Sequence, residues 1–251
     1  MTIEEPLRGL RALITGSSTG IGESIARAFA AAGATCVVHG RRREAVERIA
    51  SEIGGQFIVA DLADRGAPER LVAELTERGA LDVLVNNAGF EEHSTVANLQ
   101  TDDFAHVLQV NLLAPAALMR LCIPLLRRSA APSIINVTSI HETVAVSGNG
   151  AYASAKAALA SLSRTAAIEL GPEGIRVNTL APGAIRTDMN RDLIAAIGES
   201  RFESWIPLAR VGAPDEVASV AVFLASRGAR YITGASLVVD GGYANNLVRY
   251  D

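Results

Sequence analysis

The sequence predicts an α/β fold, a single doubly wound domain whose seven-stranded parallel sheet has helices on both faces. Short runs of β-branched and aliphatic residues alternate with longer amphipathic segments along all 251 residues. Strands separated by helices imply right-handed crossovers, and hence a parallel sheet that is covered on both sides. No internal repeat, flexible linker or long charge block divides the chain. We therefore expect one domain over residues 1–251.

Each expected element follows from its local pattern. Strands are expected at residues 10–14, 35–38, 56–59, 82–85, 133–137, 176–180 and 236–239. The first helix is expected at about 20–32 and longer helices at about 102–129 and 151–171, where aliphatic residues recur at helical spacing among alanines. Residues 184–213 show no clear element, and segments of that length commonly form lids. Residues 243–251 are expected to form a tail that reaches a neighbouring subunit.

Composition narrows the classes of partner. The formal net charge is −4, and the arginine cluster at 41–43 is too local to supply the broad basic field that attracts nucleic acid. Cys36 and Cys122 lie in apolar runs without ligand spacing, which predicts buried thiols in a reducing compartment and no metal site. No signal-peptide pattern is visible, and no stretch approaches the roughly 20 apolar residues of a bilayer span. The expectation is a cytoplasmic protein that binds neither nucleic acid nor a membrane.

A glycine-rich turn follows the first expected strand directly. Residues 15–22 read Thr-Gly-Ser-Ser-Thr-Gly-Ile-Gly and open into an amphipathic helix. A turn without bulky side chains lets the backbone approach a phosphate, and the helix N-terminus offers unpaired N–H groups and a positive dipole end. Tight-turn chemistry alone would also explain the glycines, but their position favours a dinucleotide pyrophosphate. The candidate residues are Gly16, Ser18, Thr19, Gly20, Ile21 and Gly22.

The end of the second strand indicates which dinucleotide is bound. In dinucleotide folds, an acidic residue about 20 residues after the turn binds the ribose 2′-hydroxyl, whereas an arginine accommodates a 2′-phosphate. Here the chain reads His39-Gly40-Arg41. A guanidinium without a neighbouring carboxylate favours NADP(H) over NAD(H). The alternative is that Arg41 belongs to a solvated helix start.

Tyr152 and Lys156 lie four positions apart in an expected helix, so their side chains share one face. A nearby ammonium, joined by an oxidised nicotinamide ring, favours the phenolate, and we expect the two to bring the pKa of Tyr152 toward working pH for acid–base catalysis. Amphipathic packing with a solvated lysine would explain this pair by itself. Ser139 favours the catalytic interpretation over simple packing, because it follows the fifth strand at the edge of the sheet where catalytic groups collect.

Four motifs in this order resemble those of the short-chain dehydrogenase/reductase family, which has a Rossmann-type fold. They are the turn at 15–22, Asn-Asn-Ala-Gly at 86–89, the Tyr-Lys pair with its preceding serine, and Pro-Gly at 182–183. The resemblance covers about residues 10–242 and implies hydride transfer between nicotinamide and an alcohol or ketone. It implies the catalytic residues Asn111, Ser139, Tyr152 and Lys156.

The resemblance also assigns further cofactor contacts. Thr19 stands where NADP-selective members often carry a second basic residue, so NAD(H) remains possible. Tyr152 and Lys156 would contact the nicotinamide ribose. The other implied contacts are Asp61, Leu62, Asn87, Ala88, Gly89, Pro182, Gly183, Ile185 and Thr187.

The substrate is the least determined part of the prediction. Candidate contacts beside Ser139 and Tyr152 are His141, Asn149 and Met189, with Glu142, Val144, Arg186, Asn190 and Trp205 as further candidates. Polar groups with few aromatics suit a sugar or polyol, and the local sequence resembles bacterial sugar 1-dehydrogenases.

Two alternatives stay open. One is a 3-oxoacyl-acyl-carrier-protein reductase, with Arg127 and Arg128 receiving the acidic carrier. The other is a catalytically silent NADP(H)-binding sensor. The family resemblance further implies a homotetramer assembled through the long helices and the final strand.

Overall fold

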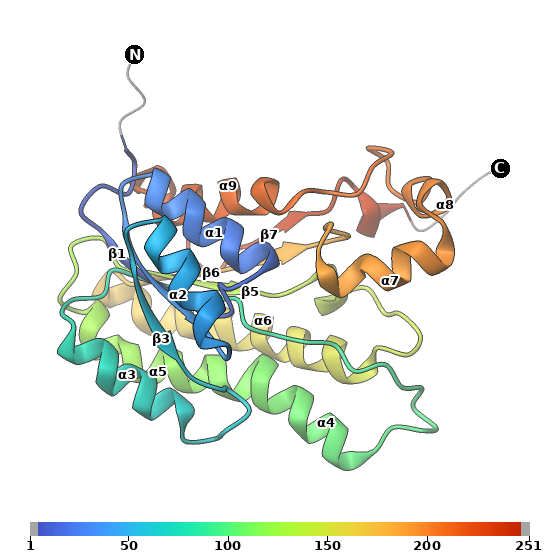
Figure 1. Ribbon diagram of the computed structural model, residues 1–251, viewed down its shortest axis with the longest axis horizontal. Helices are drawn as coiled ribbons and strands as arrows, with labels where there is room; N and C mark the ends of the chain where they lie inside the picture. Colours follow the sequence, from blue (N-terminus) through green and yellow to red (C-terminus); the bar gives the residue numbers. More distant parts are fainter. Residues whose placement is uncertain (1–4, 247–251) are drawn as a thin grey trace.

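The computed structural model describes residues 5–246, and a seven-stranded parallel sheet forms its centre (Figure 1). The strands lie in the order β3-β2-β1-β4-β5-β6-β7. Their bounds are β1 Arg11–Ile14, β2 Thr35–Gly40, β3 Gln56–Val59, β4 Val83–Asn86, β5 Ser133–Val137, β6 Arg176–Pro182 and β7 Ser236–Val239. The strand order reverses between β1 and β4, and a crevice for ligands opens at such a point in doubly wound sheets.

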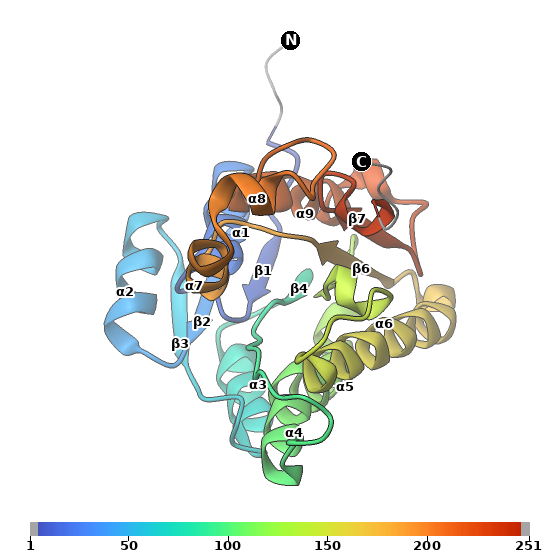
Figure 2. The same cartoon turned by 90° about the vertical axis from the view of Figure 1, so that its right-hand side faces the viewer.

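Helices cover both faces of this sheet. Figure 2 shows α3, α4, α5 and α6 on one side and α1, α2 and α9 on the other. Two further helices, α7 and α8, lie beyond the carboxyl ends of the strands (Figure 1). The bounds are α1 Gly20–Ala31, α2 Arg43–Glu52, α3 Ala67–Glu77, α4 Thr101–Leu108, α5 Ala114–Leu126, α6 Gly150–Leu170, α7 Asp188–Ile197, α8 Glu199–Glu203 and α9 Pro214–Ala225.

Successive residues of β1 show how the sheet is covered. Leu13 is fully buried in a cluster with Leu71 of α3 and Leu118 of α5. Its neighbour Ile14 is equally buried in a second cluster, which contains Phe29 of α1. Side chains alternate across a strand, so a strand that is apolar at every position requires helices on both faces. The predicted fold class is confirmed.

Residues 184–213 were expected to lack regular elements, and that expectation was wrong. The segment contains α7 and α8, and its apolar residues form a small cluster of their own around Ile194, Phe202 and Ile206. These residues pack on one another rather than on the sheet. The helices therefore depend on a local cluster that the pattern of the main core does not reveal.

The chain from Thr101 to Leu126 forms one long helical stretch, in which a π-helical turn at Gln109–Leu113 joins α4 to α5. By length and composition this stretch could cross a bilayer, so the expectation that none approaches that limit was wrong. Its most apolar window has a mean hydropathy of 1.5 and is 44% buried in the fold. A core helix of a water-soluble domain passes the same test.

The start of the expected tail packs on the protein itself. Tyr243–Asn245 form a short 3-10 turn, and the Tyr243 ring lies 6.0 Å from the Phe202 ring of α8. Asn246 donates from Nδ2 to the Trp205 carbonyl oxygen at 3.1 Å. The rest of the expected tail, residues 247–251, lies outside the described residues.

Candidate active site

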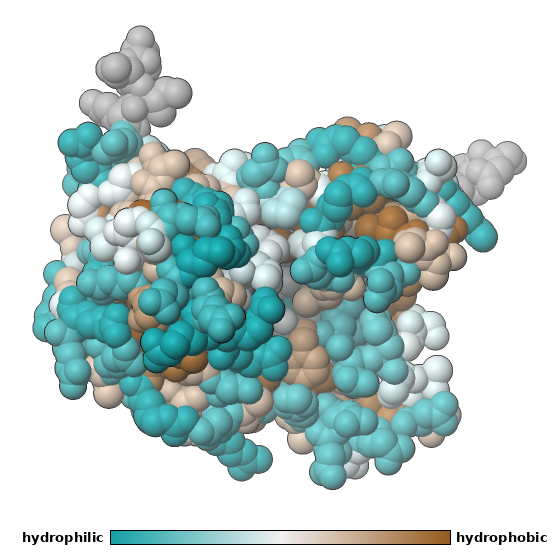
Figure 3. Space-filling view, in the orientation of Figure 1, coloured by the Kyte–Doolittle hydropathy of each residue, from teal (hydrophilic) through white to brown (hydrophobic). Residues whose placement is uncertain are grey.

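A cleft of about 1190 Å³ opens at the carboxyl edge of the sheet. Figure 3 shows the surface hollowed beside α7, with mainly hydrophilic residues around the opening. All the predicted cofactor contacts line this cleft, and so do the predicted substrate contacts Ser139, His141, Asn149, Tyr152 and Met189. The cofactor residues are Gly16, Ser18, Thr19, Gly20, Ile21, Gly22, Arg41, Asp61, Leu62, Asn87, Ala88, Gly89, Tyr152, Lys156, Pro182, Gly183, Ile185 and Thr187. Asn111 does not line the cleft and is fully buried.

The glycine turn is tied tightly to the end of β4. Asn87 donates from Nδ2 to the carbonyl oxygens of Thr15 and Gly16, at 3.0 and 3.1 Å. A Cβ atom added at Gly22 would lie 2.3 Å from the Gly16 carbonyl oxygen and 2.4 Å from Asn87 Nδ2. Gly16 itself has φ of +64°, a conformation that favours glycine. The glycines are thus required by the packing of the turn, and Gly16 and Gly22 also line the cleft.

A buried histidine accepts a hydrogen bond from the backbone of this turn. Gly16 donates its backbone N–H to His39 Nδ1 at 3.3 Å, so the imidazole accepts there as a neutral ring. Ser17 Oγ donates to the Ile14 carbonyl oxygen and accepts from the His39 backbone N–H. Burial lowers the pKa of His39 to about 4. The turn therefore rests on an uncharged group at neutral pH.

The end of β2 is open where an adenosine ribose would lie. A Cβ atom at Gly40 would come within 3.0 Å of Ser18 Oγ, so this glycine allows the two turns to approach. Arg41 is exposed at the rim of the cleft. Asp61, two residues beyond β3, is also exposed and accepts the Ala63 backbone N–H. The rim of the cleft beside the glycine turn thus carries an exposed guanidinium and an exposed carboxylate.

Three predicted catalytic residues meet at the ends of β5 and α6. Tyr152 and Lys156 are buried on one face of α6, and Ser139 is buried just after β5. Tyr152 and Ser139 share a hydrogen bond. Lys156 donates from Nζ to the Val137 carbonyl oxygen at 2.9 Å, and Nζ lies 5.4 Å from the centre of the Tyr152 ring. A phenol, a hydroxyl and an ammonium thus share one wall of the cleft.

Burial and nearby groups set the pKa of Tyr152 in the protein alone. Burial raises the pKa of the Tyr152 phenol, the Glu91 carboxylate raises it further, and the hydrogen bond with Ser139 opposes both. The expectation that Lys156 and an oxidised nicotinamide ring together bring this pKa toward working pH stays a prediction. In the protein alone the Lys156 ammonium donates to a backbone carbonyl oxygen. Burial also lowers the pKa of Lys156 to about 8.

Asn111 sits in the π-helical turn between α4 and α5, and such turns often occur at functional sites. Its Nδ2 donates to the carbonyl oxygens of Phe90 and Val107, both at 3.0 Å. Its Oδ1 is buried and has no hydrogen-bond partner among the described residues. A Cβ atom at Gly89 would lie 2.5 Å from this oxygen and 3.4 Å from Lys156 Nζ. Gly89 therefore keeps a polar space open between them.

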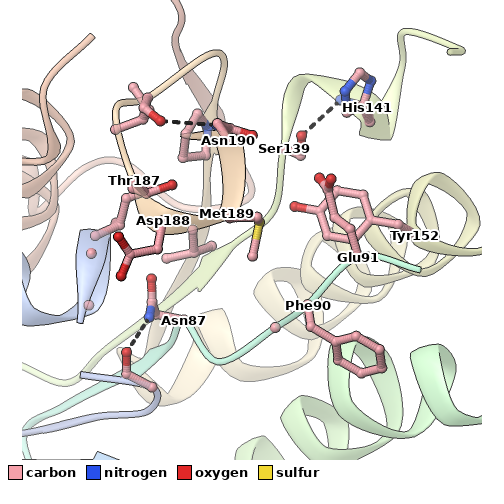
Figure 4. A pocket seen from close by; sticks show the side chains of 18 of the residues that line it. Asn87, Phe90, Glu91, Ser139, His141, Tyr152, Thr187, Asp188, Met189 and Asn190 are labelled. Carbon is pink, nitrogen blue, oxygen red and sulfur yellow. Dashed lines mark hydrogen bonds between the residues drawn. The ribbon is translucent and has the colours of Figure 1, made fainter. Parts of the chain in front are cut away.

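The predicted substrate contacts come from two separate segments. His141 stands edge-on to Tyr152, with ring centres 6.5 Å apart, and its Nδ1 lies 3.0 Å from the Val144 carbonyl oxygen. Asn149 begins α6 and is buried. Met189 points into the cleft from α7 (Figure 4).

Two of the further candidates do not line this cleft. Glu142 turns toward β7, where its Oε1 accepts from Ser236 Oγ at 2.7 Å, and Val144 lines a smaller neighbouring cavity. The other further candidates, Arg186, Asn190 and Trp205, do line the cleft.

The segment with α7 and α8 closes over the glycine turn. A Cβ atom added at Gly20 would lie 3.4 Å from Thr187 Cγ2, so the two segments touch. Asn190 donates from Nδ2 to the Ile185 carbonyl oxygen at 3.0 Å and fixes the start of α7. Arg186 forms an ion pair with Glu199 at 2.6 Å. The segment is thus held by its own contacts on one side of the cleft.

Sequence reasoning missed the wall formed by the loop after β4. Phe90, Glu91 and His93 line the cleft there, together with His106 of α4. The Phe90 and His106 rings lie 4.7 Å apart, and Glu91 Oε2 lies 3.5 Å from His93 Nε2. The available signal was position, since this loop directly follows a motif at the carboxyl end of a strand. Among residues 5–246, no cluster of His, Cys, Asp and Glu has an arrangement that could hold a metal ion.

Comparison with known proteins agrees with this architecture. Residues 16–244 match a family model described as enoyl-(acyl carrier protein) reductase. An uncharacterized oxidoreductase of Bacillus subtilis, YxjF, is 35% identical over 249 residues, with 92% of this chain and 97% of the relative covered. This chain belongs to the short-chain dehydrogenase/reductase family, whose members are NAD(P)-dependent oxidoreductases.

Two solved structures illustrate the range of relatives. A gluconate 5-dehydrogenase from Burkholderia cenocepacia, in complex with NADP and tartrate, superposes with a TM-score of 0.91 at 32% identity and covers 96% of this chain and 98% of its own. A 3-oxoacyl-(acyl-carrier-protein) reductase from Agrobacterium tumefaciens with NADP bound superposes at 0.92 and 32% identity, covering 97% and 98%. The same fold therefore serves both substrate classes that the sequence leaves open.

Proposed function

We propose that this protein is an NADP(H)-preferring oxidoreductase that transfers hydride between the nicotinamide and a secondary alcohol or ketone, with a sugar or polyol as the substrate. One observation supports this most strongly. The buried Tyr152 phenol, hydrogen-bonded with Ser139, shares a single cleft with the glycine turn. Hydride transfer requires a proton exchange group beside a dinucleotide site.

The residues present fit an NADP molecule. Gly16, Gly20 and Gly22 line the cleft without side chains, and α1 begins there with its N-terminus. Arg41 at the rim supports NADP over NAD, because a guanidinium can bind a 2′-phosphate through two hydrogen bonds. Ile185 and Thr187 would hold the nicotinamide end. The bound cofactor would supply or accept the hydride and add positive charge beside the phenol of Tyr152 when oxidised.

The chain's own residues would handle the proton. In the oxidising direction the Tyr152 oxygen takes the hydroxyl proton of the substrate as the hydride leaves carbon, and in reduction it returns that proton. Ser139 donates to the substrate oxygen and holds it against Tyr152. Lys156 would bind the nicotinamide ribose. Asn111 Oδ1 borders the polar space that Gly89 keeps open, and we propose that a water bound there relays protons to solvent.

The basic residues invoked for an acyl-carrier partner argue for the sugar or polyol instead. Arg127 forms an ion pair with Glu173 and directly follows α5. The chain then enters β5 at Ser133, the end of the strand away from the cleft. Arg127 and Arg128 are therefore placed at the opposite edge of the sheet from Tyr152. A docked acidic carrier at these residues would be too far from the cleft to deliver its thioester.

A substrate panel tests this proposal. Purified protein would be assayed with NADP⁺ and a series of aldoses and polyols, and separately with NADPH and acetoacetyl thioesters of coenzyme A and acyl-carrier protein. We expect NADPH formation with the first series at a kcat/KM at least tenfold above that for any thioester. A thioester preference would favour the reductase, and no turnover with any carbonyl or alcohol would favour the silent sensor.

We also propose a homotetramer. Large apolar side chains are exposed on the elements expected to form its interfaces, including Ile168 of α6 at 79%, Phe223 of α9 at 42% and Val238 of β7 at 53%. Such residues are usually covered by a symmetric partner. Light scattering after size-exclusion chromatography would give four times the 26.3 kDa chain mass if this is right.

A further inference from the structure

Glu91 places a carboxylate at the substrate end of the cleft. It lies on the loop after β4, and its side chain is only 15% exposed. Glu91 and Tyr152 both line this end of the cleft (Figure 4). The field of Glu91 acts on both Tyr152 and Lys156. A largely buried carboxylate at this end of the cleft must influence which substrates can approach Tyr152.

No fixed cation within the described range neutralises this carboxylate by direct contact. Its one ion-pair partner there is His93, at 3.5 Å, which carries charge only when protonated. Lys156 Nζ is engaged by the Val137 carbonyl oxygen. Arg186, on the opposite wall, forms its ion pair with Glu199. The Glu91 carboxylate therefore leaves a negative charge and hydrogen-bond acceptors at its own place in the cleft, while Lys156 keeps an ammonium on the α6 wall.

We propose that Glu91 is a specificity-determining residue that selects an uncharged polyol or sugar against the corresponding carboxylate. Its oxygens accept hydrogen bonds from the hydroxyls next to the reacting carbon, and they repel an anionic group at the same place. A relative of this chain is named for gluconate, an anion. The inference rests on the proposed function and names its substrate class.

The repulsion is strong in this setting. Like charges held a few ångströms apart in a partly buried site disfavour binding far more than they do in water. A hydroxyl at that place instead gains a charge-assisted hydrogen bond. Selectivity built from both effects gives a difference of at least about tenfold in kcat/KM between a neutral substrate and its carboxylate. Removing the charge abolishes both contributions together.

A second readout comes from the pH profile. Glu91 disfavours the Tyr152 phenolate, so its removal lowers the pKa of Tyr152 and moves the limb of the profile that reports this phenol to lower pH. The other titratable groups around the phenol are His93 on the same loop, His106 of α4, His141 after β5 and Lys156 of α6. Glu142 also follows β5. All five remain in the variant, so the shift reports Glu91.

The test compares Glu91→Gln with Glu92→Gln, since Glu92 is exposed on the same loop and does not line the cleft. The probes are D-glucose and D-sorbitol against D-gluconate, each with NADP⁺. We expect the wild type and Glu92→Gln to prefer the neutral probes by at least about tenfold. In Glu91→Gln we expect this ratio to fall by at least about tenfold and the profile to move to lower pH.

Glu91→Asp keeps the charge and guards against a folding defect. It should retain the preference for neutral probes with a lower kcat, and NADP⁺ binding by fluorescence should be unchanged in all three variants. A wild-type preference for gluconate, or an unchanged ratio in Glu91→Gln, would overturn this inference while leaving hydride transfer intact. No turnover by the wild type with any probe in the wider panel would overturn the proposed function and this inference with it.

Discussion

The two ends of the cleft are built by different means. At the cofactor end, backbone and small residues make the surface, and Asn87 ties the glycine turn to β4. At the substrate end, side chains from three separate segments make it, including Glu91, His141 and Met189. The cofactor end therefore tolerates almost no added atom, whereas the substrate end can change its chemistry without changing the fold. This difference explains how relatives with one architecture act on different substrates.

The largest effect is expected at the tightest point of the cofactor end. Gly22→Ala would place a methyl group 2.3 Å from the Gly16 carbonyl oxygen, and neither neighbour is free to move. We expect a loss of at least about 3 kcal/mol in stability, together with loss of NADP(H) binding. Urea unfolding and cofactor fluorescence would measure both.

The matched control is Gly171→Ala, because nothing lies within 4 Å of a Cβ atom there. It should leave cofactor binding unchanged. Equal losses in the two variants would mean that the turn is not specially constrained, and the contrast between the two ends of the cleft would then disappear.

His39 should make the cofactor end sensitive to acid. Its folded pKa is about 4 against an ordinary 6.5, so the folded state binds fewer protons between these values. Stability from this group is complete above pH 6.5 and is lost as the pH falls toward 4. At about 1.4 kcal/mol per pKa unit the loss is about 3 kcal/mol.

The variant His39→Asn keeps an acceptor for the Gly16 N–H but does not titrate. We expect its free energy of unfolding to fall less than that of the wild type between pH 6.5 and 4. The measurement is urea unfolding at a series of pH values. Parallel curves for the two proteins would contradict the role given to His39.

Arg41 should have the smaller, purely selective effect. Arg41→Ala is expected to weaken NADP binding by at least about tenfold with little change for NAD, because it removes a charge-assisted contact to the 2′-phosphate. Arg42→Ala is the control, since Arg42 is also exposed but does not line the cleft. Titration with both cofactors measures the selectivity. Equal weakening of NAD and NADP would assign Arg41 a general rather than a selective role.

The sequence was informative where the chemistry requires fixed spacing. The glycine turn, the Tyr152 and Lys156 pair on one helix face, and the strand pattern all follow from local rules, and each lies where it was expected. The hydrogen bond of Lys156 with Val137 depends on how α6 meets β5, which spacing does not encode. The place of Glu91 on the cleft wall likewise depends on the path of a loop.

The same reasoning explains the errors near the substrate. α7 and α8 are stabilised by a small local cluster of apolar residues. The sequence pattern of these residues resembles that of a loop. Glu142 lies three residues after Ser139, yet a 3-10 turn directs it toward β7 and away from the cleft. Residues near a motif in sequence are therefore a poor guide to the substrate wall, even where the motif itself is placed correctly.

The central claim is that Tyr152 exchanges the proton in a cleft that holds NADP(H). The variant Tyr152→Phe removes one oxygen and keeps the ring that packs against α6. We expect kcat to fall by about 10²- to 10⁴-fold while the Kd for NADPH stays within about twofold of the wild type. Turnover at the wild-type rate by Tyr152→Phe, with NADPH still bound, would contradict the account.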